Sequence, residues 1–92
     1  MRRYPSAVVS LNQAVAIAMS EGLEKGLTLM DNMGGAAELE SYHLYHSARA
    51  EILRRMGRRN EAIQEYERAL PLTTNVVEQR YLRRRIAELS RL

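Results

Sequence analysis

Residues 50–70 read AEILRRMGRRNEAIQEYERAL, and this stretch decides the fold. The small residues Ala50 and Ala62 would let two helices approach closely, and Gly57 between them can take the left-handed conformation that ends a helix. Tyr66 and Ala69 share a helical stripe with Ala62, so the tyrosine can fill the space that the small side chains leave. The stretch therefore predicts an antiparallel helical hairpin in which these five residues are structural contacts.

The same helical periodicity continues on both sides of this hairpin. It predicts five helices, over about 7–19, 23–33, 41–56, 61–71 and 76–90, with Leu39 as an alternative start of the third. No segment alternates apolar and polar residues for long enough to predict a strand. We therefore predict an all-α fold in a single domain over residues 1–92.

Short polar residues stand where several of these helices should begin. Ser6, Asn60 and Asn75 are expected N-caps, because their side chains can accept backbone N–H groups. Glu78 follows Asn75 at the spacing of a capping box.

Gly26 lies inside the predicted second helix, where it lowers helix stability by roughly 1 kcal/mol relative to alanine. We expect a packing reason for it, namely close approach to the first helix.

The composition is that of an ordinary small globular domain, with 46% apolar and 27% charged residues. The absence of cysteine excludes disulfides and thiolate metal sites. No apolar run is long enough to predict a membrane span or a secretory signal. We therefore expect a cytoplasmic protein without contact to a membrane.

The net charge of +3 is unevenly distributed. Residues 1–50 hold four basic and five acidic groups, whereas residues 51–92 hold ten basic and six acidic groups. Thirteen of the fourteen basic residues are arginine, which favours bidentate contacts with carboxylates or phosphates. The arginines of the second half either form a solvated helical face or bind an acidic partner. An acidic protein is favoured over DNA as that partner, because the sequence contains no helix-turn-helix or RNA-binding motif.

Residues 43–74 resemble a tetratricopeptide repeat. The matching positions are Ala50, Gly57, Ala62, Tyr66 and Ala69. The positions that differ from the usual pattern are His46, Arg49 and Thr74. The resemblance implies a right-handed stack of two helical hairpins, about 7–33 and 41–71, followed by a capping helix over about 76–90.

The whole chain resembles a more particular group of proteins. Residues 6–19, SAVVSLNQAVAIAM, are similar to the SPVVALNRAVAVAM that opens the C-terminal extension of one group of bacterial ECF-type RNA polymerase sigma factors. Residues 26–31 resemble its GLxxLD, and residues 42–58 resemble its YHLLHAARAELLRRLGR. Residues 78–89 resemble its closing ERxFLxRRLAEL. The similarity is in order and covers nearly all of residues 6–89.

This resemblance implies a non-catalytic domain that regulates a sigma factor through protein–protein contacts in transcription initiation. The expected partners are the upstream sigma-factor regions, RNA polymerase or another regulator, with no direct binding of nucleic acid by this chain. A stand-alone adaptor that binds a peptide or protein is the alternative. A basic helical nucleic-acid binder is a third, less favoured hypothesis.

Tetratricopeptide proteins bind partners along a concave groove made by the first helix of each pair, and this implies two candidate surfaces here. In the first pair the residues are Val8, Leu11, Val15, Ala18 and Met19, which form an apolar stripe. In the second pair they are Leu44, Ser47, Glu51, Arg54 and Arg55, which are mixed and basic. An apolar stripe of this size needs a cover. The candidates are the fifth helix, a second subunit in a homodimer, or an upstream domain.

Arg49 falls on an otherwise apolar stripe and should be partly buried, so it needs a carboxylate partner. The candidate carboxylates are Asp31, Glu38, Glu40 and Glu65. We favour Asp31, because the preceding helix should lie beside the third. The expected role is a structural ion pair, and binding of a partner is the competing hypothesis.

His43 and His46 lie three residues apart and could share a metal, but without a nearby third ligand we expect packing instead. No nucleophile–base pair or phosphate-binding loop is visible in the sequence. We therefore predict no catalytic residue, no metal site and no cofactor.

Overall fold

The chain is all-α in the residues that the computed structural model describes, which are 4–33 and 37–91. These residues contain no strand, and the all-α prediction is confirmed. The elements in chain order are α1 (Tyr4–Ser20), α2 (Leu23–Met33), α3 (Ala37–Glu40), α4 (His43–Arg55), α5 (Arg59–Ala69), the 3-10 turn η1 (Leu70–Leu72) and α6 (Val76–Ser90).

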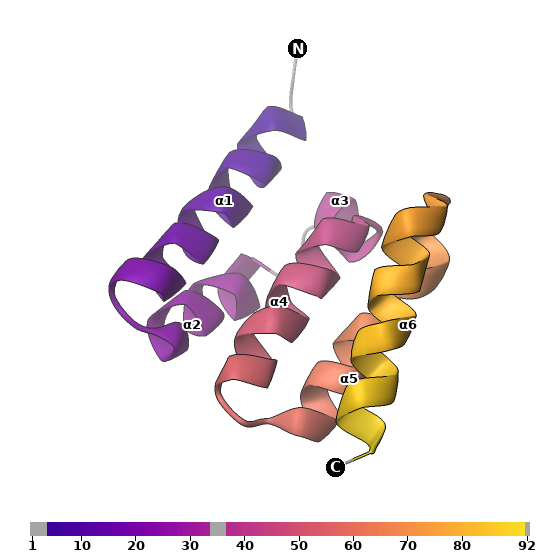
Figure 1. Cartoon of the computed structure of the whole chain (residues 1–92). Coiled ribbons are helices and arrows are strands. Elements are labelled where there is room, and N and C mark those ends of the chain that lie inside the picture. Colours follow the sequence, from indigo (N-terminus) through magenta and orange to yellow (C-terminus); the bar gives the residue numbers. More distant parts are fainter. Residues whose placement is uncertain (1–3, 34–36, 92) are drawn as a thin grey trace.

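The five long helices form two hairpins and a C-terminal helix (Figure 1). Helix α1 packs on α2, α4 packs on α5, and α6 packs on α5. Helix α2 also contacts α4, which joins the two hairpins. Helices α1, α4 and α6 run in the same direction along one side of the molecule, with α4 in the middle, as the tetratricopeptide-like pattern predicts.

The core depends on small residues and tyrosine, as the stretch at 50–70 predicts. Ala50, Ala62, Tyr66 and Ala69 have no solvent-accessible surface, and they lie where α4 and α5 meet. Gly57 has a φ of 81°, so it ends α4 in the left-handed conformation that other residues rarely adopt. The hairpin α4–α5 is therefore held by the residues that matched the repeat.

Gly26 lies against α1 at a distance that excludes any side chain. A Cβ atom built on Gly26 would lie 2.3 Å from the Cβ of Ala18 and 2.8 Å from the carbonyl oxygen of Ala14. The expected close approach of the first two helices is therefore present. It gives the physical reason for a glycine inside α2.

Two of the three predicted N-caps are wrong. Helix α1 begins at Tyr4, so Ser6 lies inside it; Pro5 is tolerated in this first turn because helical N–H groups have no partner there. Helix α5 begins at Arg59, because the carbonyl of Arg58 already accepts the N–H of Ala62, and this places Asn60 within the helix. The cap at Asn75 is present, since its Oδ1 accepts the Glu78 N–H at 3.0 Å.

The third predicted helix corresponds to α4, which begins two residues after the predicted start at 41, and the alternative start at Leu39 is wrong because the separate short helix α3 lies there. Tyr42 has extended backbone angles and separates the two. The carbonyl of Glu40 accepts a hydrogen bond from His46 Nε2 at 2.9 Å, instead of the Leu44 N–H that a continuous helix would supply. A side chain therefore competes with the backbone and ends the first segment. Gly34 and Gly35, which separate the second and third predicted helices in the sequence, lie outside the described residues.

Candidate functional site

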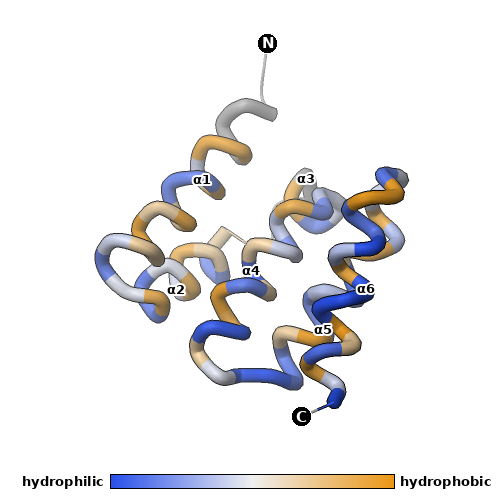
Figure 2. The backbone as a smooth tube through the Cα atoms, viewed as in Figure 1, coloured by the Kyte–Doolittle hydropathy of each residue, from blue (hydrophilic) through white to orange (hydrophobic). Residues whose placement is uncertain are grey.

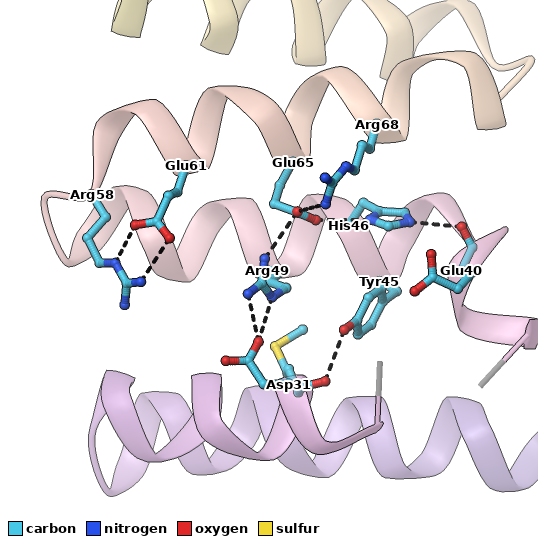
Figure 3. A network of polar contacts seen from close by, with 10 residues as sticks. Asp31, Glu40, Tyr45, His46, Arg49, Arg58, Glu61, Glu65 and Arg68 are labelled. Carbon is cyan, nitrogen blue, oxygen red and sulfur yellow. Dashed lines mark hydrogen bonds and ion pairs between the residues drawn. The ribbon is translucent and has the colours of Figure 1, made fainter. Parts of the chain in front are cut away.

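The polar side chains that sequence singles out meet around one buried carboxylate, that of Glu65 on α5 (Figure 3). Its side chain is 4% exposed. Glu65 accepts from His46 Nδ1 at 2.9 Å and from Arg68 Nη1 at 2.6 Å, and it pairs with Arg49 Nη1 at 3.1 Å. Three donors therefore compensate for the loss of water around this anion.

Arg49 connects this buried cluster to the first hairpin. Its Nε and Nη2 donate to Asp31 Oδ1 at 3.0 and 2.6 Å, so Asp31 is the partner that the sequence favours. Glu65, another of the candidates, is a second partner of the same guanidinium. Glu40 contributes its backbone carbonyl to His46 instead, and the side chain of Glu38 is outside those described. Arg49 thus ties α2, α4 and α5 together.

Neither histidine lies in a site with enough ligands for a metal. His46 is buried between the Glu65 carboxylate and the Glu40 carbonyl, and His43 contacts Glu78 Oε1 at 2.7 Å. In residues 4–33 and 37–91 no group of three or more His, Cys, Asp or Glu side chains could hold a metal ion. The His43–Glu78 contact instead connects α4 with α6.

A second polar cluster surrounds Glu51, in the mixed part of the predicted groove. Arg54 forms a hydrogen-bonded ion pair with its carboxylate, Arg55 Nε donates to it at 3.0 Å, and the Tyr66 hydroxyl donates at 3.1 Å. Burial alone raises the pKa of Glu51, but the hydrogen bonds from Arg54 and Arg55 outweigh it and lower the pKa to about 2. Burial and then the Glu51 charge raise the pKa of Tyr66. Two guanidiniums around one carboxylate leave this surface positive.

An apolar groove lies between α4 and α6. It encloses about 380 Å³, and its lining residues are His43, Leu44, Ser47, Val77, Glu78, Tyr81 and Leu82. Three of its large apolar side chains face solvent: Leu44 is 40% exposed, Val77 72% and Tyr81 42%. Side chains of this kind, grouped in a hollow, are typical of a protein-binding surface.

A second hollow of about 290 Å³ continues this groove toward α1. It shares Leu44, Ser47 and Tyr81 with the first hollow and adds Leu11, Val15 and Glu51 among its lining residues. The two hollows thus form one face across α1, α4 and α6, which we name the concave face. This face contains five of the predicted groove residues, namely Leu11, Val15, Leu44, Ser47 and Glu51.

The apolar stripe of α1 is largely buried, contrary to the prediction that it needs a separate cover. Leu11 is 3% and Ala18 2% exposed, and Val8 and Val15 are partly buried. The stripe turns toward α2, because Ala18 lies against Gly26 in the hairpin. Helix α6 is not this cover, since α4 lies between α1 and α6 (Figure 1). Only Met19 is well exposed, and its Sδ lies 3.7 Å from Arg55 Nη1.

Val77 and Tyr81 belong to the concave face but are missing from the predicted site. They lie four residues apart on α6, off the buried stripe that Leu82 and Leu89 share. That spacing is the signal that could have found them, because an apolar pair that lies off the buried stripe of a terminal helix is not needed for its packing.

The outer side of α6 is strongly basic. In Figure 2, blue marks the hydrophilic residues that make up much of α6. In the described part of the chain, no ion pair or hydrogen bond involves the exposed side chains of Arg80, Arg83, Arg84 and Arg91. Arg85 differs: it pairs with Glu88 at 3.2 Å, and its Nε donates to the Tyr81 hydroxyl at 3.3 Å. The positive balance of the second half is therefore concentrated on α6.

Comparison with known proteins identifies a longer relative. Over 89 residues, which cover 97% of this chain, the sequence is 38% identical to an uncharacterized protein of Rhizobium meliloti strain 1021. The chain spans 21% of that protein's length, so about four fifths of the relative lies outside the match. No model of a known protein family matches the chain, and no solved structure matches it significantly.

Within residues 4–33 and 37–91, no helix combines the length and hydropathy that a membrane span requires.

Proposed function

We propose that this chain is a non-catalytic protein–protein interaction domain that regulates an ECF-type RNA polymerase sigma factor in the cytoplasm. The observation that carries the proposal is the concave face, where Leu44, Val77 and Tyr81 line a hollow and remain in contact with water. A small domain gains stability by burying such side chains, so their exposure around a hollow favours a partner that covers them.

The tie to sigma factors is supported by sequence. The similarity to the C-terminal extension of these proteins runs in order through residues 6–89. The relative from Rhizobium meliloti is several times longer than the match, which suits a domain that works attached to other regions. The partner would then be an upstream sigma-factor region, RNA polymerase or another regulator.

The polar clusters support a structural role rather than catalysis. Glu65 is enclosed by three donors of its own chain, and Glu51 is held by Arg54, Arg55 and Tyr66. A catalytic acid or base needs access to a substrate and a pKa near the working pH. A pKa of about 2 for Glu51 is far from that range.

A transcription assay with the Rhizobium meliloti relative tests the proposal. The full-length relative is compared with a version that lacks the segment matched by this chain, and with a third in which this chain replaces that segment, each with purified core RNA polymerase and candidate promoters. We expect promoter-directed transcripts from the full-length protein, a changed yield without the segment, and recovery with the replacement. Absence of promoter-directed transcripts from the full-length relative would instead favour a stand-alone adaptor.

A further inference from the structure

Helix α6 places unpaired cations directly beside the apolar groove. Arg80 follows Val77 by three residues and Arg84 follows Tyr81 by three, so each arginine is the helical neighbour of a groove residue. Both arginines are exposed, and within the described residues neither has a carboxylate or hydrogen-bond partner. The outer edge of the groove is therefore lined by free guanidiniums.

Outside α6 and the adjoining Arg91, the described arginines pair within the chain, with the exception of Arg59 on α5. The arginines that pair with a carboxylate of the same chain are Arg49, Arg54, Arg55, Arg58, Arg68 and Arg85. On α6, the only acidic residues are Glu78, which contacts His43, and Glu88, which pairs with Arg85. No carboxylate is left on α6 to neutralise Arg80 and Arg84. The missing negative charge must come from solution or from a partner.

We propose that the groove between α4 and α6 binds an acidic amphipathic helix of a partner protein. Its apolar side chains would contact Leu44, Val77 and Tyr81, and its carboxylates would pair with Arg80 and Arg84. The inference rests on the proposed function, because it names the partner chemistry of the same concave face.

A helix fits this groove better than an extended peptide does. The groove floor offers side chains such as Leu44 and Leu82, and the described residues contain no strand edge that could pair with a peptide backbone. A helix satisfies its own backbone hydrogen bonds, so it can place an apolar face in such a groove without losing them. Apolar residues spaced three or four apart on the partner would form the face that contacts the hollow between α4 and α6.

Nucleic acid fits this groove less well than an acidic helix does. A phosphate backbone could contact Arg80 and Arg84, but it would leave Leu44 and Val77 facing a strongly hydrated polyanion. Carboxylates on a helix supply the same bidentate acceptors for arginine together with an apolar side for the groove. The combination of free arginines and an exposed apolar floor therefore points to protein.

The test measures binding of designed peptides to the full chain by fluorescence anisotropy. The first probe is a labelled helix of about 18 residues, long enough to be partly helical alone, with leucines on one face and glutamates beside them. The second probe has lysine in place of each glutamate, and the third is a short DNA duplex. We expect the acidic helix to bind at least about tenfold more tightly than the other two, with an affinity that falls as salt rises from about 50 to about 200 mM.

Variants of α6 locate the site. Arg80→Glu combined with Arg84→Glu should weaken binding of the acidic helix at least about tenfold, as should Val77→Asp. Arg83→Glu is the matched control: it is an equally unpaired, exposed arginine of the same helix, but it follows Tyr81 by two residues and so faces away from the groove. We expect it to change the affinity less than about twofold. Circular dichroism confirms that each variant is folded.

Three results would overturn the inference. One is equal binding of the basic and acidic peptides. Another is tighter binding of the DNA duplex than of the acidic helix. A third is a loss of affinity in Arg83→Glu as large as the loss in the double variant. That result would indicate that the net charge of the chain attracts the peptide without a defined binding site. The transcription assay on the relative is independent of these outcomes, so a wrong partner chemistry can be told apart from a wrong proposed function.

Discussion

Most arginines of the hairpin α4–α5 pair with carboxylates of the same chain, whereas most arginines of α6 do not. In the hairpin, Arg49, Arg54 and Arg68 each pair with a carboxylate of the same chain, and two of those carboxylates are Glu51 and Glu65. On α6, the side chains of Arg80 and Arg84 have no partner in the described part of the chain. Similar clusters of arginine in a sequence can therefore form structural ion pairs in one helix and stay unpaired, and so able to bind a partner, in another.

Removal of the buried carboxylate should have the largest effect on stability. Glu65→Ala removes the buried carboxylate that Arg49 and His46 share. Breaking a buried pair in this way lowers the free energy of unfolding by about 3–5 kcal/mol. For a domain of this size that corresponds to a fall in Tm of roughly 15 °C or more, measured by circular dichroism. Glu67→Ala is the control, because Glu67 is exposed and two residues away; a similar fall in both variants would contradict a special role for Glu65.

Loss of the bridging cation should have the next largest effect. Arg49→Met keeps most of the bulk and removes the charge, so Glu65 retains His46 and Arg68 while Asp31 returns to solvent. We expect a loss of about 2–3 kcal/mol in the free energy of unfolding, measured by urea denaturation. An unchanged unfolding midpoint would show that the ion pair between the hairpins does not stabilise the fold. Arg59→Met, at an exposed arginine of α5, is the control.

The Glu51 cluster predicts a dependence of stability on pH. Its folded pKa of about 2 lies below the ordinary value of 4.5, so its contribution is fully present above about pH 4.5 and is lost as pH falls toward 2. A pKa change of one is worth about 1.4 kcal/mol, and screening by solvent reduces the effect of this partly exposed group to about 1–2 kcal/mol. The stability difference between the wild type and Glu51→Gln should therefore shrink as pH falls from about 5 to 2. A constant difference over this range would contradict the assignment.

The arginines of α6 should have the smallest effect on folding. Arg80→Ala combined with Arg84→Ala breaks no ion pair or hydrogen bond within the described chain, so we expect the free energy of unfolding to change by less than about 0.5 kcal/mol. Within this limit we expect a gain in stability, because like charges are removed from one helix. A loss of more than 1 kcal/mol, as a rough limit, would show that these side chains belong to the fold and would remove the contrast with α4–α5.

Much of the fold follows from the sequence, because its strongest signals are local. The spacing of apolar residues predicts α2 and α6 with the bounds that the structure shows, and Gly57 ends α4 as expected. The predicted starts of α1 and α5 are wrong. These helices begin before the polar residues that the prediction chose as caps, with Pro5 in the first turn of α1 and Arg58 directly before α5. Helix ends depend on competition among several nearby groups, and a single residue type does not decide that competition.

The site is less predictable, because it depends on contacts between distant residues. The Arg49–Asp31 pair could be expected, since a charge on an apolar stripe needs a partner. The central role of Glu65 was missed: its position on the stripe of Ala62 and Ala69 is visible in sequence, but three donors converge on it only after α4 and α5 pack. The groove wall on α6 likewise forms only when that helix docks on α5.

The common direction of α1, α4 and α6 gives the concave face an electrical polarity along its length. Each peptide dipole points the same way in these three helices, so the partial negative charges of their C-terminal ends gather at one end of the face. A guest helix aligned with them would add its own dipole in parallel, whereas one lying in the opposite sense would set its positive end against that region. The face thus favours one of the two orientations of a bound helix, by about 1 kcal/mol or less, and a paramagnetic label on either end of the guest would show which.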